Sequence, residues 1–93
     1  MKCLNADEVI KHMTVLDPSW ELHVNAIQRK FVFKDFKNAF SFMSAVAAIA
    51  EKLNHHPDWT NNYNTVIIKL NTNDLGCLTE LDFIFAREID ILN

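Results

Sequence analysis

The hydrophobic pattern of this chain switches between two periods, and that switching limits the folds that it can adopt. Apolar and polar residues alternate over 20–24 and again over 27–33, as they do in half-buried strands. A β-branched run over 65–70 predicts another strand, and the polar stretch 60–64 before it predicts a short, irregular one. Short turns separate the strands of each pair, which favours antiparallel pairing.

Three other segments carry helix signals. Residues 5–17 begin with a capping box and end before a proline, which disfavours helix in the residue preceding it. Residues 36–53 have a period of 3.6, and residues 79–92 begin with a second capping-box spacing. We therefore predict an α+β fold, in which three helices and a four-stranded antiparallel sheet follow the order α-β-β-α-β-β-α.

The helix predicted over 36–53 carries two apolar stripes, whereas a helix lying on a sheet needs only one. The stripes consist of Phe36, Phe40, Met43, Ala47 and Ala50, and of Phe42, Val46, Ile49 and Leu53. We therefore expect this helix to be buried on two sides. Its second cover is either another subunit or the N- or C-terminal helix, and the sequence does not choose between them.

Length and charge exclude several classes of protein. The 93 residues are predicted to form one domain, 1–93, and the hydrophobic fraction of 49% is enough for a modest core. The longest apolar stretch, 45–50, is far too short to span a membrane, and the first residues have no signal-peptide pattern. The net charge of -3 and the lack of a basic stripe argue against direct nucleic-acid binding. We expect a soluble, cytoplasmic protein with no membrane partner.

Glycine and cysteine are both scarce. Gly76 is the only glycine, and phosphate-binding loops need several glycines close together, so the chemistry has to come from side chains. Cys3 and Cys77 are too few for a disulfide framework or a cysteine-based zinc site. The sequence does not exclude a disulfide between them, but free thiols in a reducing cytosol are the simpler prediction.

Two adjacent histidines, His55 and His56, follow the longest predicted helix and precede Pro57. Imidazole titrates near neutral pH and serves readily in proton transfer. Because the chain leaves the helix at Pro57, both rings can point toward one cavity. The alternative is a pair of polar residues at a helix C-terminus, where cations are favoured. No metal site is expected, because zinc takes three or four protein ligands and the other histidines have no spacing relation to this pair.

Three nearby side chains have both functional and structural interpretations. Glu51 lies one turn before the histidines. Its functional interpretation is that it orients an imidazole or accepts a hydrogen bond from a ligand, and its structural interpretation is a solvated carboxylate. Trp59 suits stacking on a flat ring as well as packing in the core. Asp82 fits a structural role better than catalysis, since an acid three residues after Thr79 caps a helix and suits its dipole.

Taken together, these residues resemble the pterin-4a-carbinolamine dehydratases, over nearly the whole chain. The most specific part is the pattern Glu51-x-x-x-His55-His56-Pro57, followed by Tyr63. The other matching segments include Trp20-Glu21-Leu22, Phe31-x-Phe33-x-x-Phe36, Leu70-x-Thr72 and Leu78-Thr79-x-x-Asp82.

The resemblance implies both an activity and a site. The reaction would remove water from 4a-hydroxytetrahydropterin to give quinonoid dihydropterin, in the recycling of tetrahydropterin, with no metal or organic cofactor. The subunits would form homodimers or homotetramers through their helices. His55 would be the acid–base residue and His56 would assist it, with Asp82 supporting the site. The residues implied to bind the pterin are Glu51, Pro57, Trp59, Thr72, Asn73 and Asp74.

The chain departs from the family pattern at three positions. Asn73 stands where the family usually has a third histidine, Cys77 where a small residue is usual, and Leu81 where some members have arginine. Asparagine exchanges hydrogen bonds but cannot shuttle a proton near neutral pH. These departures keep an alternative open, namely a catalytically weakened relative that binds a pterin or a protein, as a transcriptional coactivator does.

Overall fold

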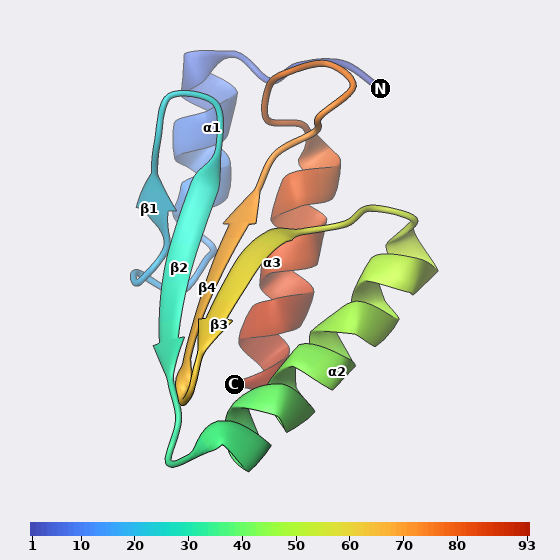
Figure 1. The fold of residues 1–93 in the computed structure, drawn as a ribbon. Helices are drawn as coiled ribbons and strands as arrows, with labels where there is room; N and C mark the ends of the chain where they lie inside the picture. Colours follow the sequence, from blue (N-terminus) through green and yellow to red (C-terminus); the bar gives the residue numbers. More distant parts are fainter.

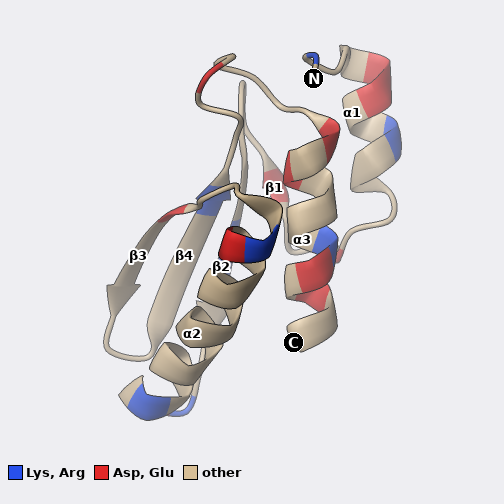
Figure 2. Cartoon of the chain, turned by 90° about the vertical axis from the view of Figure 1, so that its right-hand side faces the viewer, with Lys and Arg blue, Asp and Glu red and all other residues tan.

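A computed structural model describes residues 1–93 as a four-stranded sheet with three helices on one side of it (Figure 1, Figure 2). Along the chain the elements are α1 (Ala6–Met13), β1 (Glu21–Leu22), β2 (Ile27–Val32), α2 (Phe36–Leu53), β3 (Asp58–Asn62), β4 (Thr65–Leu70) and α3 (Glu80–Leu92). The strands lie in the order β1-β2-β4-β3, and each neighbouring pair is antiparallel. The predicted fold class and element order are confirmed.

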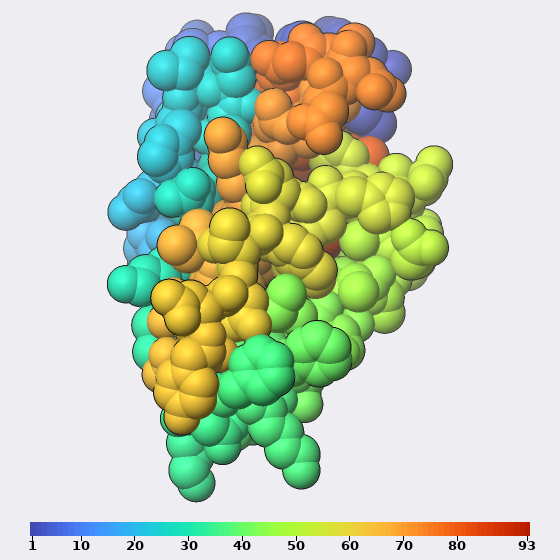
Figure 3. Space-filling model, in the orientation of Figure 1, coloured from blue at the N-terminus to red at the C-terminus, as the bar shows by residue number.

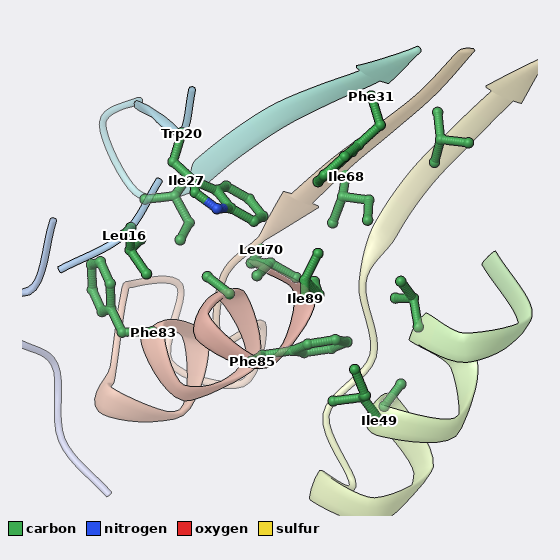
Figure 4. Close-up of a cluster of buried hydrophobic side chains, with 14 of the residues drawn as sticks. Leu16, Trp20, Ile27, Phe31, Ile49, Ile68, Leu70, Phe83, Phe85 and Ile89 are labelled. Carbon is green, nitrogen blue, oxygen red and sulfur yellow. The ribbon is translucent and has the colours of Figure 1, made fainter. Parts of the chain in front are cut away.

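The core lies between the sheet and α3. Alternate residues of β2 and β4 face inward, and aromatic and aliphatic side chains of α3 lie against them (Figure 4). Fully burying one such side chain contributes about 1.5–3 kcal/mol, so this layer is a main source of stability. The least exposed of these side chains are Ile27, Val66, Ile68, Leu70, Phe83, Phe85 and Ile89.

The two stripes of α2 have different surroundings. α2 packs against α3 and β4, and one stripe is buried through Phe42, Val46 and Ile49. The other stripe is open over its first part, since Phe36 is 48% exposed and Phe40 is 56% exposed. The chain itself buries Ala50 and partly buries Met43, so the uncovered part of this stripe consists of Phe36, Phe40 and Ala47. Neither α2 nor any other helix is both long and apolar enough to cross a membrane.

The strand expected over 20–24 is shorter than predicted, because a polar contact on α3 holds its first residue and a turn includes its last two. The Trp20 indole N–H and an Arg29 guanidinium N–H both donate to Oδ1 of Asp90, at 2.7 and 2.8 Å. Oδ2 of Asp90 accepts from the Asp17 amide at 2.9 Å. These bonds hold residues 17–20 against α3, and at the other end the His23 amide donates to the Ala26 carbonyl at 2.8 Å within the turn. Only Glu21–Leu22 therefore pair with β2.

The same loop holds a carboxylate whose pKa is lowered. The Ser19 amide donates to Oδ1 of Asp17 at 2.8 Å, and Ser19 lowers the pKa of Asp17, with a smaller contribution from Arg29. The contacts that lower this pKa stabilise the folded protein only while Asp17 is ionised. Their stabilisation is therefore fully present above the ordinary pKa of an aspartate. It is lost as the pH falls through the lowered pKa.

Cys3 and Cys77 form a disulfide, so the prediction of free thiols is wrong. Their Cα atoms lie 5.7 Å apart, and no free cysteine remains. The backbone holds the two segments together next to the bridge, because the Leu4 amide donates to the Leu78 carbonyl at 2.9 Å. The disulfide therefore fastens the segment before α1 to the loop between β4 and α3.

We expect reduction of this disulfide to lower the free energy of unfolding by about 2 to 4 kcal/mol, because a cross-link between distant residues restricts the unfolded chain. Denaturant unfolding with and without a dithiol reductant measures the change. Cys3→Ser is the matched control, since its stability cannot respond to the reductant. A wild-type midpoint that is the same in both conditions contradicts the prediction.

Candidate active site

The C-terminal end of α2 turns sharply at Asn54. This residue has the left-handed conformation, with φ 50° and ψ 46°, which asparagine tolerates better than most residues. The Asn54 amide donates to the Ala50 and Glu51 carbonyls, and the His55 amide donates to the Ala50 carbonyl at 3.0 Å. The turn ends the helix as predicted and carries the two histidines off its axis.

The loop after β4 forms the opposite wall. The Thr72 amide donates to the Cys77 carbonyl at 2.8 Å, and the Gly76 amide donates to the Thr72 carbonyl at 2.9 Å. Gly76 has a φ of 66°, a region that favours glycine, so the only glycine is used to close this loop. The loop, orange in Figure 3, borders the yellow-green end of α2 on the molecular surface.

A hollow of about 170 Å³ lies between the two segments. All of its lining residues are polar, and none of them is a lysine or an arginine. They are Asn54, His55, His56, Thr72, Asn73 and Asp74. Five of these six were singled out from the sequence, and they come together although His56 and Thr72 are 16 positions apart. Such a surface suits a small, polar ligand that exchanges hydrogen bonds.

The central contact of the hollow joins His55 to Asp82. His55 Nε2 lies 2.6 Å from Asp82 Oδ1, with the imidazole 10% exposed and the carboxylate fully buried. Asp82 Oδ2 accepts from the Thr79 amide at 2.9 Å, which is the helix cap predicted for Asp82. Asp82 therefore caps α3 with one oxygen and holds the imidazole with the other.

The number of available protons fixes the direction of these bonds. A carboxylate only accepts, so His55 Nε2 carries the hydrogen that points at Asp82. Thr72 Oγ1 donates its one proton to Asp82 Oδ2 at 2.9 Å, and it therefore accepts from Thr79 Oγ1, 2.7 Å away. In a neutral His55 ring, Nδ1 is then left as a hydrogen-bond acceptor. Arg29 Nε is the only buried side-chain nitrogen or oxygen without a hydrogen-bond partner. Since Nδ1 of His55 also has no partner in the protein, it is accessible to solvent or a ligand.

His56 lies in a more open environment. Its Nε2 is 2.8 Å from Glu51 Oε2, and both side chains are mostly exposed, at 61% and 78%. The predicted contact of Glu51 with an imidazole is therefore made with His56 and not with His55. The two histidines have different surroundings, because His55 is held by a buried carboxylate and His56 by a solvated one.

Some of the predicted residues lie outside the hollow, and two unpredicted ones belong to the site. Glu51, Pro57 and Trp59 do not line the hollow, and Trp59 is half-buried against the hydrophobic core. Asn54 lines it, and Thr79 joins the hydrogen-bond network behind it. A helix cap was the signal that the sequence carried for Asn54, and Thr79 had in addition the match of Leu78-Thr79-x-x-Asp82 to the family. No cluster of three or more His, Cys, Asp or Glu side chains is placed to hold a metal ion.

The solved structures that resemble this chain define the class of protein. The crystal structure of a transcriptional coactivator/pterin dehydratase from Brucella melitensis has a TM-score of 0.92 and 41% sequence identity, covering 98% of each chain. A pterin dehydratase-like protein identified as a RuBisCO assembly factor in the alpha-carboxysome has a TM-score of 0.66 over 87% of this chain and 92% of that one. At 23% identity, the second likeness concerns the fold alone. The fold is that of the pterin dehydratase-like proteins.

The sequence comparisons narrow the class to a family. A relative from Prochlorococcus marinus (strain MIT 9312), provisionally named as a pterin-4-alpha-carbinolamine dehydratase, is 54% identical over 90% of this chain and 88% of its own length. The family model for pterin 4 alpha carbinolamine dehydratase matches residues 2–92. The chain belongs to the pterin carbinolamine dehydratase family, and the resemblance noted in its sequence is confirmed.

Proposed function

We propose that this chain removes water from 4a-hydroxytetrahydropterin to give quinonoid dihydropterin, with His55 as the proton-transfer residue. The observation that carries the proposal is the bond between His55 and the buried Asp82 carboxylate, beside a polar hollow. Membership of the dehydratase family supports the same reaction. The proposal needs neither a metal nor an organic cofactor.

The reaction makes two demands on the site. The C4a–oxygen bond breaks while the leaving hydroxyl takes up a proton, and N5 of the ring loses a proton, so that water and the quinonoid product result. With Nε2–H directed at Asp82, Nδ1 of His55 is available to take the N5 proton, and the carboxylate stabilises the imidazolium that forms. The same imidazolium, or His56 beside it, then protonates the departing oxygen. Each assisted transfer is typically worth about 10²- to 10⁴-fold.

Two lining residues, and Glu51 outside the hollow, suit the polar edge of a pterin. Asn73 and Asp74 are exposed in the facing loop, and Glu51 is exposed near the end of α2. Carboxylates accept from ring N–H and amino groups, and an amide both donates and accepts. In this proposal these three residues hold the pterin. Pro57 and Trp59 stay predictions, as residues that shape the surroundings of the site.

We expect His55→Ala to lower kcat for dehydration by about 10²- to 10⁴-fold, because the variant lacks the group that moves the proton. The measurement is the conversion of 4a-hydroxytetrahydropterin by purified protein. His23→Ala is the matched control, since His23 is exposed near the turn between β1 and β2. Equal rates for wild type and His55→Ala exclude the role of His55, and a wild type that does not speed the reaction excludes the function.

Asn73 is the feature that favours the alternative, a relative that binds a pterin or a protein with little turnover. If Asn73 only positions the substrate, Asn73→His adds a third proton-transfer group, and we expect kcat to rise by up to about 10²-fold. Asn73→Gln, which keeps the amide, is the control and leaves kcat near the wild-type value. An unchanged rate in Asn73→His means that this position does not limit the reaction.

We also propose that the open stripe of α2 joins copies of this chain into a homodimer or homotetramer. Phe36 and Phe40 are each about half exposed, with ring centroids 5.9 Å apart, and Ala47 is exposed on the same stripe. An apolar stripe along the longest helix resembles the seam by which helices associate. A second α2 is the simplest cover that matches its length and its apolar character.

We expect Phe40→Glu to shift the protein to monomers, because it places a charge within the apolar stripe. Light scattering after size-exclusion chromatography, at micromolar concentration, measures the mass. Ile91→Glu is the control, since Ile91 is exposed on α3, away from the stripe. A wild-type protein that runs as a monomer, or a Phe40→Glu variant of unchanged mass, contradicts the proposal.

A further inference from the structure

We propose that Thr72 is a positioning residue for His55, and not a contact of the pterin as the family resemblance implies. Only the kinetic consequence of this inference, a change in kcat, rests on the proposed function. The structural part of the inference concerns how the imidazole is held in the ligand-free protein. The observation behind it is the connection of Thr72, Thr79 and Asp82 by hydrogen bonds behind the hollow.

The hydroxyl of Thr72 is already engaged. Its one proton goes to Asp82 Oδ2 at 2.9 Å, and one of its lone pairs accepts from Thr79 Oγ1 at 2.7 Å. A threonine hydroxyl has a single proton and two lone pairs, so no donor is left for a ligand. Thr72 is also half-buried, whereas its neighbours Asn73 and Asp74 are exposed. The neighbours are thus better placed to meet a pterin.

The engaged hydroxyl acts on His55 through one carboxylate. Asp82 Oδ2 accepts from Thr79 N and Thr72 Oγ1, while Oδ1 faces His55 Nε2 at 2.6 Å. The two donors on Oδ2 fix the rotation of the carboxylate group, and the carboxylate in turn selects the Nε2–H tautomer of His55. Loss of the Thr72 donor leaves the cap from Thr79 N as the only restraint on Oδ2. The imidazole then loses part of what sets its tautomer and its direction.

This arrangement also connects three separate parts of the chain. His55 follows α2, Thr72 follows β4, and Asp82 lies in the first turn of α3. The loop that carries Asn73 and Asp74 thereby fixes the imidazole across the hollow from them. Binding and proton transfer share one framework, although the residues that bind and the residue that transfers the proton differ.

The test compares Thr72→Val, which keeps the shape and removes the hydroxyl, with Thr72→Ser, which restores the hydroxyl. Thr60→Val is the matched control, because Thr60 is exposed on β3. The first readout is the ¹⁵N NMR spectrum of the His55 ring in the free protein. We expect the Nε2–H tautomer in wild type, Thr72→Ser and Thr60→Val, and a mixture of tautomers in Thr72→Val.

The second readout separates kcat from KM. A misplaced reacting group costs rate, so Thr72→Val is expected to lower kcat by about 10- to 10²-fold with KM within about twofold of wild type. Thr72→Ser is expected to recover most of that loss. A raised KM with an unchanged His55 spectrum overturns the inference and makes Thr72 a substrate contact. An unchanged spectrum together with unchanged kinetics overturns it too, and leaves Thr72 a structural role only.

The inference and the proposed function fail in different ways. If wild type does not dehydrate the pterin, but the His55 tautomer still changes in Thr72→Val, positioning by Thr72 is supported and the dehydratase function is overturned. If Thr72→Val does not fold, Thr72→Ala read by the same NMR spectrum replaces it. A pure Nε2–H tautomer in a folded Thr72→Ala overturns the inference.

Discussion

The buried carboxylate of Asp82 is the constraint on which the site depends. A fully buried charge is costly unless donors surround it, and here one donor comes from the end of α2 and two come from the loop between β4 and α3. The carboxylate can stay buried only while α3, the loop after β4 and the end of α2 keep their positions. Removing any one donor therefore affects the fold and the imidazole together.

The fold could be predicted because periodicity is local. Strand alternation, the helix period and the capping boxes each need only a few neighbouring residues, and they gave the element order and the cap at Asp82. The bond from Asp82 to His55 could not be predicted, because these residues are 27 positions apart and no spacing rule connects them. The contact of Asp90 at the start of β1 could not be predicted either, since its partners lie 61 to 73 positions away.

The cysteines were misjudged for a related reason. Their separation of 74 positions carries no pairing signal, and free thiols were inferred together with a cytoplasmic location, which stays a prediction. The histidine pair was easier to assess, because proton-transfer chemistry depends on residue type as well as on position.

The disulfide also places one part of the site inside a covalent ring and leaves α3 outside it. The bond from Cys3 to Cys77 closes a ring that encloses α1, the whole sheet, α2 and every residue that lines the hollow. α3 follows the ring and is not enclosed by it, although it supplies the carboxylate that holds His55. Local opening of α3 would thus separate His55 from Asp82 while both walls of the hollow stayed within the ring. The helix that supplies the carboxylate is thus held in place by core packing and hydrogen bonds alone, and not by the cross-link.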